Sequence, residues 1–103
     1  MSTINKLAAT IAARASTSPD SSYTAKLLRD GIEKCAKKLG EEAFELALAA
    51  ASKDKAHTAQ EAADVIYHLL VLLQACGVSL AEVETVLAAR EVQSGLEEKA
   101  SRG

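Results

Sequence analysis

The chain has 103 residues, which is enough for one domain with a single small core. Its 12 lysine and arginine residues nearly balance its 14 aspartate and glutamate residues, which argues against a dedicated nucleic-acid-binding protein with a basic face. Apolar residues make up 49% of the chain and aromatic residues only 3%, so alanine and leucine dominate the apolar share, and both favour helices.

The N-terminal segment has no compact apolar run followed by a cleavage site, so a secretory signal is not expected. The longest apolar run, 65–76, is interrupted by polar residues and is too short to span a bilayer. Cys35 and Cys76 have no metal-binding or redox spacing, and we expect both to be reduced core residues. The sequence therefore predicts a cytoplasmic protein without a membrane segment.

Helical apolar spacing and turn residues predict four or five helices and no strand. Their expected ranges, in chain order, are 4–15, 22–30, 32–51, 58–76 and a last helix that begins at Ser79. Two helices carry a capping-box pattern at their start, Thr58 with Glu61 and Ser79 with Glu82. We predict an all-α fold, an antiparallel helical bundle. The chain is expected to divide into an all-α domain at 1–95 and a polar C-terminal tail at 96–103.

The helix at 32–51 is apolar around more than half of its circumference, from Cys35 and Leu46 round to Leu48. Such a face is too wide to be covered by one neighbouring helix of the same chain. We therefore predict an oligomer, a homodimer or a larger assembly, in which the surplus apolar surface is buried between chains.

Three carboxylates crowd one side of this helix. At about 100° per residue, Glu41, Glu45 and Glu42 fall at roughly 0°, 40° and 100° around its axis. Like charges one turn apart destabilise a helix by about a few tenths of a kcal/mol, so a sequence chosen only for helix stability would place a lysine among them. We expect a positive group to be bound beside these residues.

The next helix carries acidic residues on a buried side. Its segment 65–73 is apolar nearly all round, which is typical of a helix buried on every side. Glu61, Asp64 and His68 nevertheless share an arc about 60° wide. Carboxylates are seldom buried without a partner. Two of them, facing three from the preceding antiparallel helix, would form an oxygen-rich pocket suited to a hard cation such as Mg²⁺.

Each of these residues also has a simpler explanation when it is considered alone. Glu61 could serve only the capping box with Thr58, and the three acids of the preceding helix could form a solvated face. His68 could be an ordinary core or interface histidine. The joint occurrence of the two acidic patterns on consecutive helices favours a site over these explanations.

Lys34 and Lys38 lie on the arc of the carboxylates, two turns and one turn before Glu41. Their simpler role would be to form salt bridges with neighbouring glutamates. Their functional role would be to bind substrate phosphates beside a metal ion.

The acidic pattern of Glu41, Glu42 and Glu45, followed by Glu61 and Asp64, resembles the signature of the all-α nucleotide pyrophosphohydrolase (MazG-like) superfamily. Within that superfamily the chain resembles the phosphoribosyl-ATP pyrophosphatase family over about residues 4–92. The segments that carry this resemblance are 22–28 (SYTAKLL), 38–42 (KLGEE) and 63–70 (ADVIYHLL). One departure is Ile32, where relatives often have proline.

The resemblance implies hydrolysis of the α–β phosphoanhydride of 1-(5-phosphoribosyl)-ATP to 1-(5-phosphoribosyl)-AMP and pyrophosphate, the second step of L-histidine biosynthesis. It also implies that Glu42, Glu45, Glu61 and Asp64 hold Mg²⁺, with Glu41 as a ligand or as a base that orients water. The sequence has no glycine-rich phosphate loop and no nucleophile with a recognisable partner, which independently favours direct attack by water.

Two alternatives stay open from the sequence. A house-cleaning hydrolase of aberrant nucleoside triphosphates or dUTP would share the acidic site and differ in its pocket for base and sugar. A non-enzymatic helical dimerisation module would carry the acids as surface decoration only. Binding of Mg²⁺ would argue against the module, because a ligand that binds only the folded state stabilises it.

Overall fold

The computed structural model describes residues 2–91, which form five helices and no strand. The helices are α1 (Thr3–Arg14), α2 (Tyr23–Asp30), α3 (Ile32–Ala51), α4 (Lys55–Cys76) and α5 (Leu80–Glu91). The prediction of an all-α fold is confirmed. The expected boundary between a domain at 1–95 and a tail at 96–103 lies outside the described residues.

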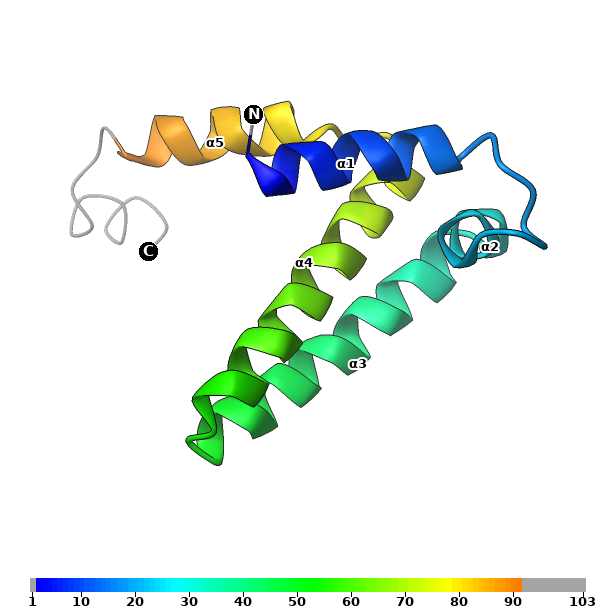
Figure 1. Ribbon diagram of the computed structural model, residues 1–103. Helices are drawn as coiled ribbons and strands as arrows, with labels where there is room; N and C mark the ends of the chain where they lie inside the picture. The colour runs from blue at the N-terminus through cyan, green and yellow to red at the C-terminus, as the bar shows by residue number, and fades with distance from the viewer. Residues whose placement is uncertain (1, 92–103) are drawn as a thin grey trace.

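The long helices α3 and α4 form an antiparallel pair that is the centre of the fold (Figure 1). The short turn between them contains Lys53 with a positive φ of 64° and Asp54 as the N-cap of α4. The helix α2 packs against both members of the pair, and α1 packs against α4. In Figure 1, α1 and α5 cross the end of α4 that is far from this turn. Residues on the facing sides of α3 and α4 are therefore held at fixed positions relative to each other.

The start of α4 differs from the sequence prediction. The helix begins at Lys55, about one turn before the expected Thr58, because Asp54 is the N-cap and its Oδ1 accepts a hydrogen bond from the His57 amide at 3.0 Å. Thr58 lies inside the helix and donates its hydroxyl to the Asp54 carbonyl at 2.7 Å. The predicted capping box of Thr58 with Glu61 is therefore wrong, and the Glu61 carboxylate takes no part in capping.

The predicted capping box at the start of α5 is confirmed. The Ser79 amide donates to Glu82 Oε2, and the Glu82 amide donates to Ser79 Oγ, both at 3.1 Å. The preceding helix α4 ends at Gly77, whose φ of 73° is the left-handed conformation that glycine adopts without strain. This end matches the predicted stop and redirects the chain by 108° into α5.

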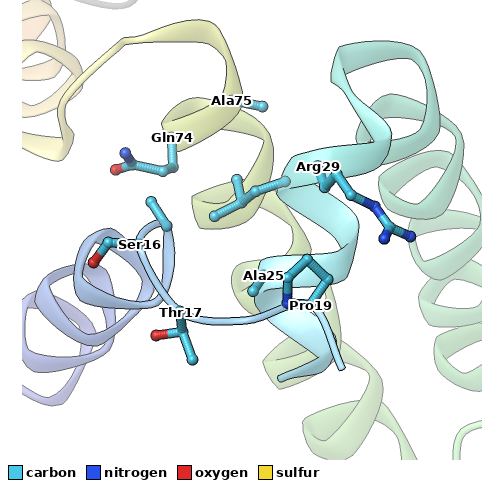
Figure 2. A pocket seen from close by; sticks show the side chains of 9 residues that line it. Ser16, Thr17, Pro19, Ala25, Arg29, Gln74 and Ala75 are labelled. Carbon is cyan, nitrogen blue, oxygen red and sulfur yellow. The ribbon is translucent and has the colours of Figure 1, made fainter. Parts of the chain in front are cut away.

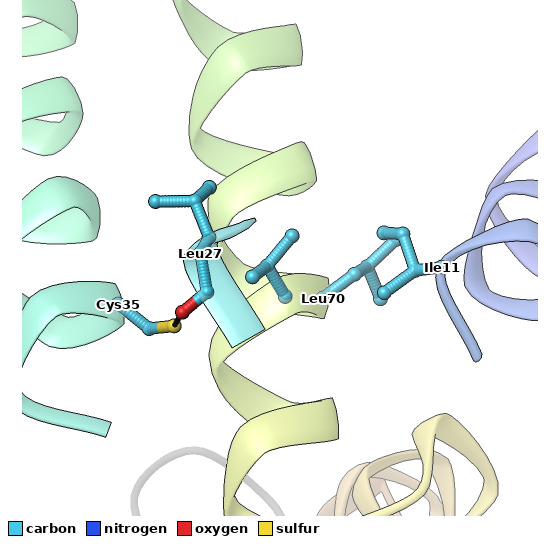
Figure 3. Close-up of a cluster of buried hydrophobic side chains, with 5 residues drawn as sticks. Ile11, Leu27, Cys35 and Leu70 are labelled. Atoms are coloured by element: carbon cyan, nitrogen blue, oxygen red, sulfur yellow. Dashed lines mark hydrogen bonds between the residues drawn. The ribbon is translucent and has the colours of Figure 1, made fainter. Parts of the chain in front are cut away.

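The buried core joins four helices through a small cluster of side chains (Figure 3). Its buried members are Ile11 of α1, Leu27 of α2, Cys35 of α3, and Leu70 and Val71 of α4. The Cys35 thiol donates to the Leu27 carbonyl oxygen at 3.3 Å, which ties α3 to α2.

The two cysteines do not share one environment, contrary to the sequence prediction. Both are free thiols, but only Cys35 is buried. Cys76 is exposed and is the last residue of α4, directly before the turn at Gly77.

Large apolar side chains remain exposed on the single chain. On α3, Phe44 is 63% exposed and Leu48 is 51% exposed, and α5 has no buried residue. These two residues lie on the part of α3 that was expected to be surplus apolar surface. Among the described residues, no single helix is long and apolar enough to cross a membrane; α4 and α5 meet that criterion only as a sharply bent pair.

Candidate functional site

Three carboxylates meet between α3 and α4. Glu42 of α3, and Glu61 and Asp64 of α4, each present one oxygen atom, and these three atoms lie within 4.8 Å of one another. Glu61 and Asp64 are three residues apart, so they lie on the same side of α4 and face Glu42 across the helix pair. Three acidic oxygens at this separation repel one another unless a cation or protons lie between them.

The Glu61 side chain is 16% exposed, whereas Asp64 is an exposed residue. The Oε1 atom of Glu61 lies 3.2 Å from His57 Nε2, on the preceding turn of α4. Its Oε2 atom is buried and has no hydrogen-bond partner among the described residues. A buried carboxylate oxygen without a donor is costly, so this atom is suited to bind a cation or a proton.

The repulsion within the cluster also affects the pKa of Glu42. Burial raises the pKa of Glu42, and the neighbouring carboxylates of Glu61 and Asp64 raise it further, while Lys38 opposes the shift. A protonated Glu42 could donate a hydrogen bond to Glu61, which is one reason why the neutral form is favoured. A divalent cation bound between the same oxygens would have the opposite effect and favour the ionised form.

Two of the predicted acidic residues lie outside this cluster. Glu41 and Glu45 are exposed on α3, and neither belongs to the three-oxygen group. Glu41 Oε1 lies 3.6 Å from Lys38 Nζ. The structure thus brings together Glu42, Glu61 and Asp64 of the predicted site, and the roles of Glu41 and Glu45 stay predictions.

His68 is buried one turn after Asp64. Its side chain packs edge-on against the ring of Tyr67, with ring centroids 4.9 Å apart and an interplanar angle of 79°. Its Nδ1 atom has no hydrogen-bond partner among the described residues. Burial lowers the pKa of His68 and Lys38 lowers it further, against Asp64 and Glu41. The neutral form of the imidazole is therefore favoured.

The predicted lysines line a small cavity beside the carboxylates. Lys34 and Lys38 border a cavity of about 190 Å³ between α2 and α3, together with Tyr23 and Lys26 of α2. The sequence interpretation gave no role to these two α2 residues. Tyr23 and Lys26 are three residues apart and so lie on one side of α2, the helix directly before the one that carries Lys34 and Lys38. This spacing was the sequence signal that could have indicated them.

Cys35 is not a candidate nucleophile. Its thiol is buried and donates a hydrogen bond to the Leu27 carbonyl. Burial raises the pKa of Cys35, and nearby Cys76 and Asp30 raise it further, so the thiolate that would attack a substrate is disfavoured.

A larger cavity of about 500 Å³ lies near the C-terminal end of α4 (Figure 2). It is bordered by Ser16, Thr17 and Pro19 of the α1–α2 connection, by Ala25 and Arg29 of α2, and by Gln74 and Ala75 of α4. Arg29 is its one charged lining residue, and that guanidinium lies 3.4 Å from Asp30 Oδ1. Gln74 is ten residues, about 15 Å along the helix, beyond Asp64, so this cavity is separate from the carboxylates.

The fold and the site define an all-α protein with an acidic centre between two antiparallel helices. A family model described as phosphoribosyl-ATP pyrophosphohydrolase matches residues 4–91. The phosphoribosyl-ATP pyrophosphatase of Cereibacter sphaeroides is 58% identical over the full length of both chains. That of Dinoroseobacter shibae is 58% identical, over 99% of this chain and all of the relative. Phosphoribosyl-ATP pyrophosphatase 1 of Rhodopseudomonas palustris is 57% identical, over 97% and 94%.

The chain belongs to the phosphoribosyl-ATP pyrophosphohydrolase family, since the family model and these relatives cover nearly all of it. The resemblance inferred from the acidic pattern and its flanking segments is confirmed.

Proposed function

We propose that this chain hydrolyses the α–β phosphoanhydride of 1-(5-phosphoribosyl)-ATP, releasing 1-(5-phosphoribosyl)-AMP and pyrophosphate in the second step of L-histidine biosynthesis. Relatives named phosphoribosyl-ATP pyrophosphatase, which match the chain from end to end, support this substrate. The observation that carries the chemistry is the cluster of Glu42, Glu61 and Asp64, because splitting a phosphoanhydride requires negative charge on the phosphates to be neutralised.

The donor set of this cluster fits Mg²⁺. All its atoms are carboxylate oxygens, which Mg²⁺ prefers as ligands. The unpartnered Oε2 of Glu61 and the raised pKa of Glu42 both indicate a place where positive charge is needed. We propose that Glu42, Glu61 and Asp64 hold the ion, and that Glu45 is a further ligand. When bound, the ion would supply charge neutralisation and a water molecule of lowered pKa.

The remaining residues of the proposed mechanism bind and orient the substrate. Lys34 and Lys38 supply positive charges for the phosphates. The Nζ atom of Lys38 lies 3.6 Å from Oε1 of Glu41. Glu41 is exposed next to the cluster, where it can accept a proton from an attacking water or complete the ion's ligands. We propose catalytic roles for Glu41, Glu42 and Glu45 on this basis.

We also propose that the active protein is a cytoplasmic homodimer or higher oligomer. The support is the exposed apolar surface of α3, where Phe44 is 63% exposed and Leu48 is 51% exposed. Burying a fully exposed side chain of this size is worth about 1.5–3 kcal/mol, so burying the exposed part of each would stabilise an interface by about 1 kcal/mol or more. Sedimentation at micromolar concentration tests the claim, and a monomer there would contradict it.

A substrate panel tests the activity against its main alternative. Purified protein with Mg²⁺ is given phosphoribosyl-ATP, ATP, dUTP and a damaged nucleoside triphosphate in parallel, and pyrophosphate release is measured. The proposal predicts that phosphoribosyl-ATP gives by far the highest kcat/KM. A preference for dUTP or damaged triphosphates would indicate a house-cleaning hydrolase instead, and no turnover of any substrate would favour a helical dimerisation module.

A further inference from the structure

The cavity between α2 and α3 is lined by more positive charge than the proposed mechanism uses. Its volume is about 190 Å³, and its lining residues are Tyr23, Lys26, Leu27, Asp30, Lys34 and Lys38. Three lysines and one aspartate are thus among the residues that line the cavity. A cavity of this size and charge is suited to a small anion.

The lysines of this cavity are poorly neutralised by the protein itself. The only carboxylate in the lining, Asp30, is 3.4 Å from the guanidinium of Arg29. Lys38 has Glu41 at 3.6 Å, but across residues 2–91 no ion pair involves Lys26 or Lys34. Like charges around one cavity repel one another, and a bound anion would turn that repulsion into attraction.

The positions of these lysines on their helices add to the electrostatic repulsion at the cavity. Lys26 follows Tyr23 by three residues on α2, and Lys34 precedes Lys38 by four residues on α3, so each pair occupies one side of its helix. Lys34 also lies in the first turn of α3, at the positive end of the helix dipole, where a cation is unfavourable. An anion in the cavity would offset the repulsion between Lys34 and Lys38 and the unfavourable position of Lys34.

Lys38 connects the cavity with the acidic cluster. It lines the cavity, and its Nζ atom lies 3.6 Å from Oε1 of Glu41, which directly precedes Glu42 on α3. Phosphates in the cavity would therefore be neighbours of a phosphoanhydride held at the carboxylates. The β and γ phosphates leave together as pyrophosphate, and the β phosphate forms one side of the scissile linkage, whereas the ribose 5-phosphate of the same substrate is many bonds away.

We propose that this cavity is the subsite for the leaving pyrophosphate and that Lys26 of α2 is a phosphate-binding residue together with Lys34 and Lys38. The proposal rests on the proposed hydrolysis of phosphoribosyl-ATP. It assigns α2 a direct part in substrate binding, which the acidic pattern on α3 and α4 does not.

Calorimetric titration of pyrophosphate into the purified full-length protein, in the presence of Mg²⁺, tests the subsite without turnover. Lys26→Ala is compared with wild type, with Lys26→Arg, and with Lys37→Ala. Lys37 is a matched control because it is an exposed lysine of α3 that does not line the cavity. Ribose 5-phosphate is the second probe, and thermal melting verifies folding, with Lys26→Gln in reserve if Lys26→Ala does not fold.

The expected result is that Lys26→Ala weakens pyrophosphate binding about tenfold or more, because a charge-assisted hydrogen bond is lost. Lys26→Arg should retain most of the affinity, Lys37→Ala should stay within about twofold of wild type, and ribose 5-phosphate binding should not change. Unchanged pyrophosphate binding in Lys26→Ala, an equal loss in Lys37→Ala, a loss confined to ribose 5-phosphate, or no pyrophosphate binding by wild type would each overturn the subsite.

Turnover of phosphoribosyl-ATP by wild type, measured on the same preparation, separates the two proposals. Turnover without any dependence of pyrophosphate binding on Lys26 would contradict the subsite alone. Pyrophosphate binding that depends on Lys26, in a protein that does not hydrolyse phosphoribosyl-ATP, would support the subsite and contradict the proposed substrate.

Discussion

The carboxylates of Glu42 and Glu61 face each other from antiparallel helices, with one oxygen of each no more than 4.8 Å from the other and from Asp64. Glu61 has one oxygen beside His57 and the other buried without a donor. The helix pair therefore holds two acidic groups closer together than their ionised forms favour, and this relationship gives the first two predictions.

Glu42→Gln should stabilise the protein when no divalent cation is present. The neutral amide removes one negative charge from the cluster and can donate a hydrogen bond to Glu61. We expect a gain of about 0.5 kcal/mol, or roughly 2–4 °C in melting temperature. The same variant should lose the stabilisation that Mg²⁺ gives the wild type. Thermal melting with EDTA and with MgCl₂ measures both effects.

Glu84→Gln is the matched control for this variant, because Glu84 is an exposed residue of α5 away from the cluster. It should change neither the metal-free stability nor the response to Mg²⁺. If Glu42→Gln destabilised the metal-free protein, or still responded fully to Mg²⁺, repulsion within the cluster would not be the correct account.

Stabilisation by Mg²⁺ should depend on pH through Glu42. Because the pKa of Glu42 in the folded protein lies above its ordinary value, protons compete with the ion in a window that begins just above the ordinary pKa of a glutamate and extends towards neutral pH. The shift in melting temperature caused by Mg²⁺ should be largest above this window and should vanish as the pH falls through it.

In the metal-free protein the sign of the Glu42 contribution is reversed. An acid whose pKa is raised by folding lowers stability when it is ionised, so this contribution should become less unfavourable as the pH falls through the same window. Melting curves of wild type and Glu42→Gln, recorded at several pH values without metal, isolate the contribution of Glu42 to stability. A wild type and variant with identical pH profiles would contradict it.

The cap of α4 gives a prediction about stability that is independent of catalysis. Asp54→Ala removes the side chain that accepts from the His57 amide, and should cost about 1 kcal/mol of unfolding free energy. Thr58→Ala should cost clearly less, since Thr58 lies inside the helix and only donates back to the Asp54 carbonyl. Chemical denaturation of the two variants measures this. A larger loss of unfolding free energy for Thr58→Ala than for Asp54→Ala would indicate that Thr58 is the N-cap of α4.

Most of the helices could be predicted from the sequence because apolar spacing and glycines mark them strongly. The range of α3 is the predicted one, and Gly31 and Gly77 end their helices as expected. The start of α4 was missed because two residues compete for one cap. Asp54 offers a carboxylate one turn before Thr58, and the helix extends to the earlier acceptor since that adds hydrogen bonds.

The composition of the acidic cluster could be predicted only in part. The residue pattern places Glu41, Glu42 and Glu45 on one arc of α3, but it does not show where the axis of α4 passes along that arc. In the structure, the line of α3 that faces α4 runs through Cys35, Glu42 and Ala49, which are seven residues apart and of which the first and last are buried. Glu42 therefore points inwards, while its two acidic neighbours are exposed.

Lys38 is predicted to act on substrate rather than only on helix stability. It lines the cavity between α2 and α3 and is also 3.6 Å from Glu41, so two roles compete. If it binds phosphate, Lys38→Ala should raise KM, lower kcat or both, with no loss of thermal stability. If it only bridges Glu41, stability should fall by about a few tenths of a kcal/mol and the kinetics should hold. Steady-state kinetics and melting of this variant and of Lys37→Ala decide between the roles.

The most direct test of a metal-dependent hydrolase centred on these carboxylates is pyrophosphate release from phosphoribosyl-ATP at saturating Mg²⁺, for wild type, Asp64→Asn and Glu45→Gln. We expect wild-type turnover that EDTA abolishes, and folded variants whose activity is lost, because each substitution removes a carboxylate that we propose as a ligand of the ion. Near wild-type activity in either variant would contradict its assignment as a ligand. Turnover by wild type that persists in EDTA would contradict the metal centre itself.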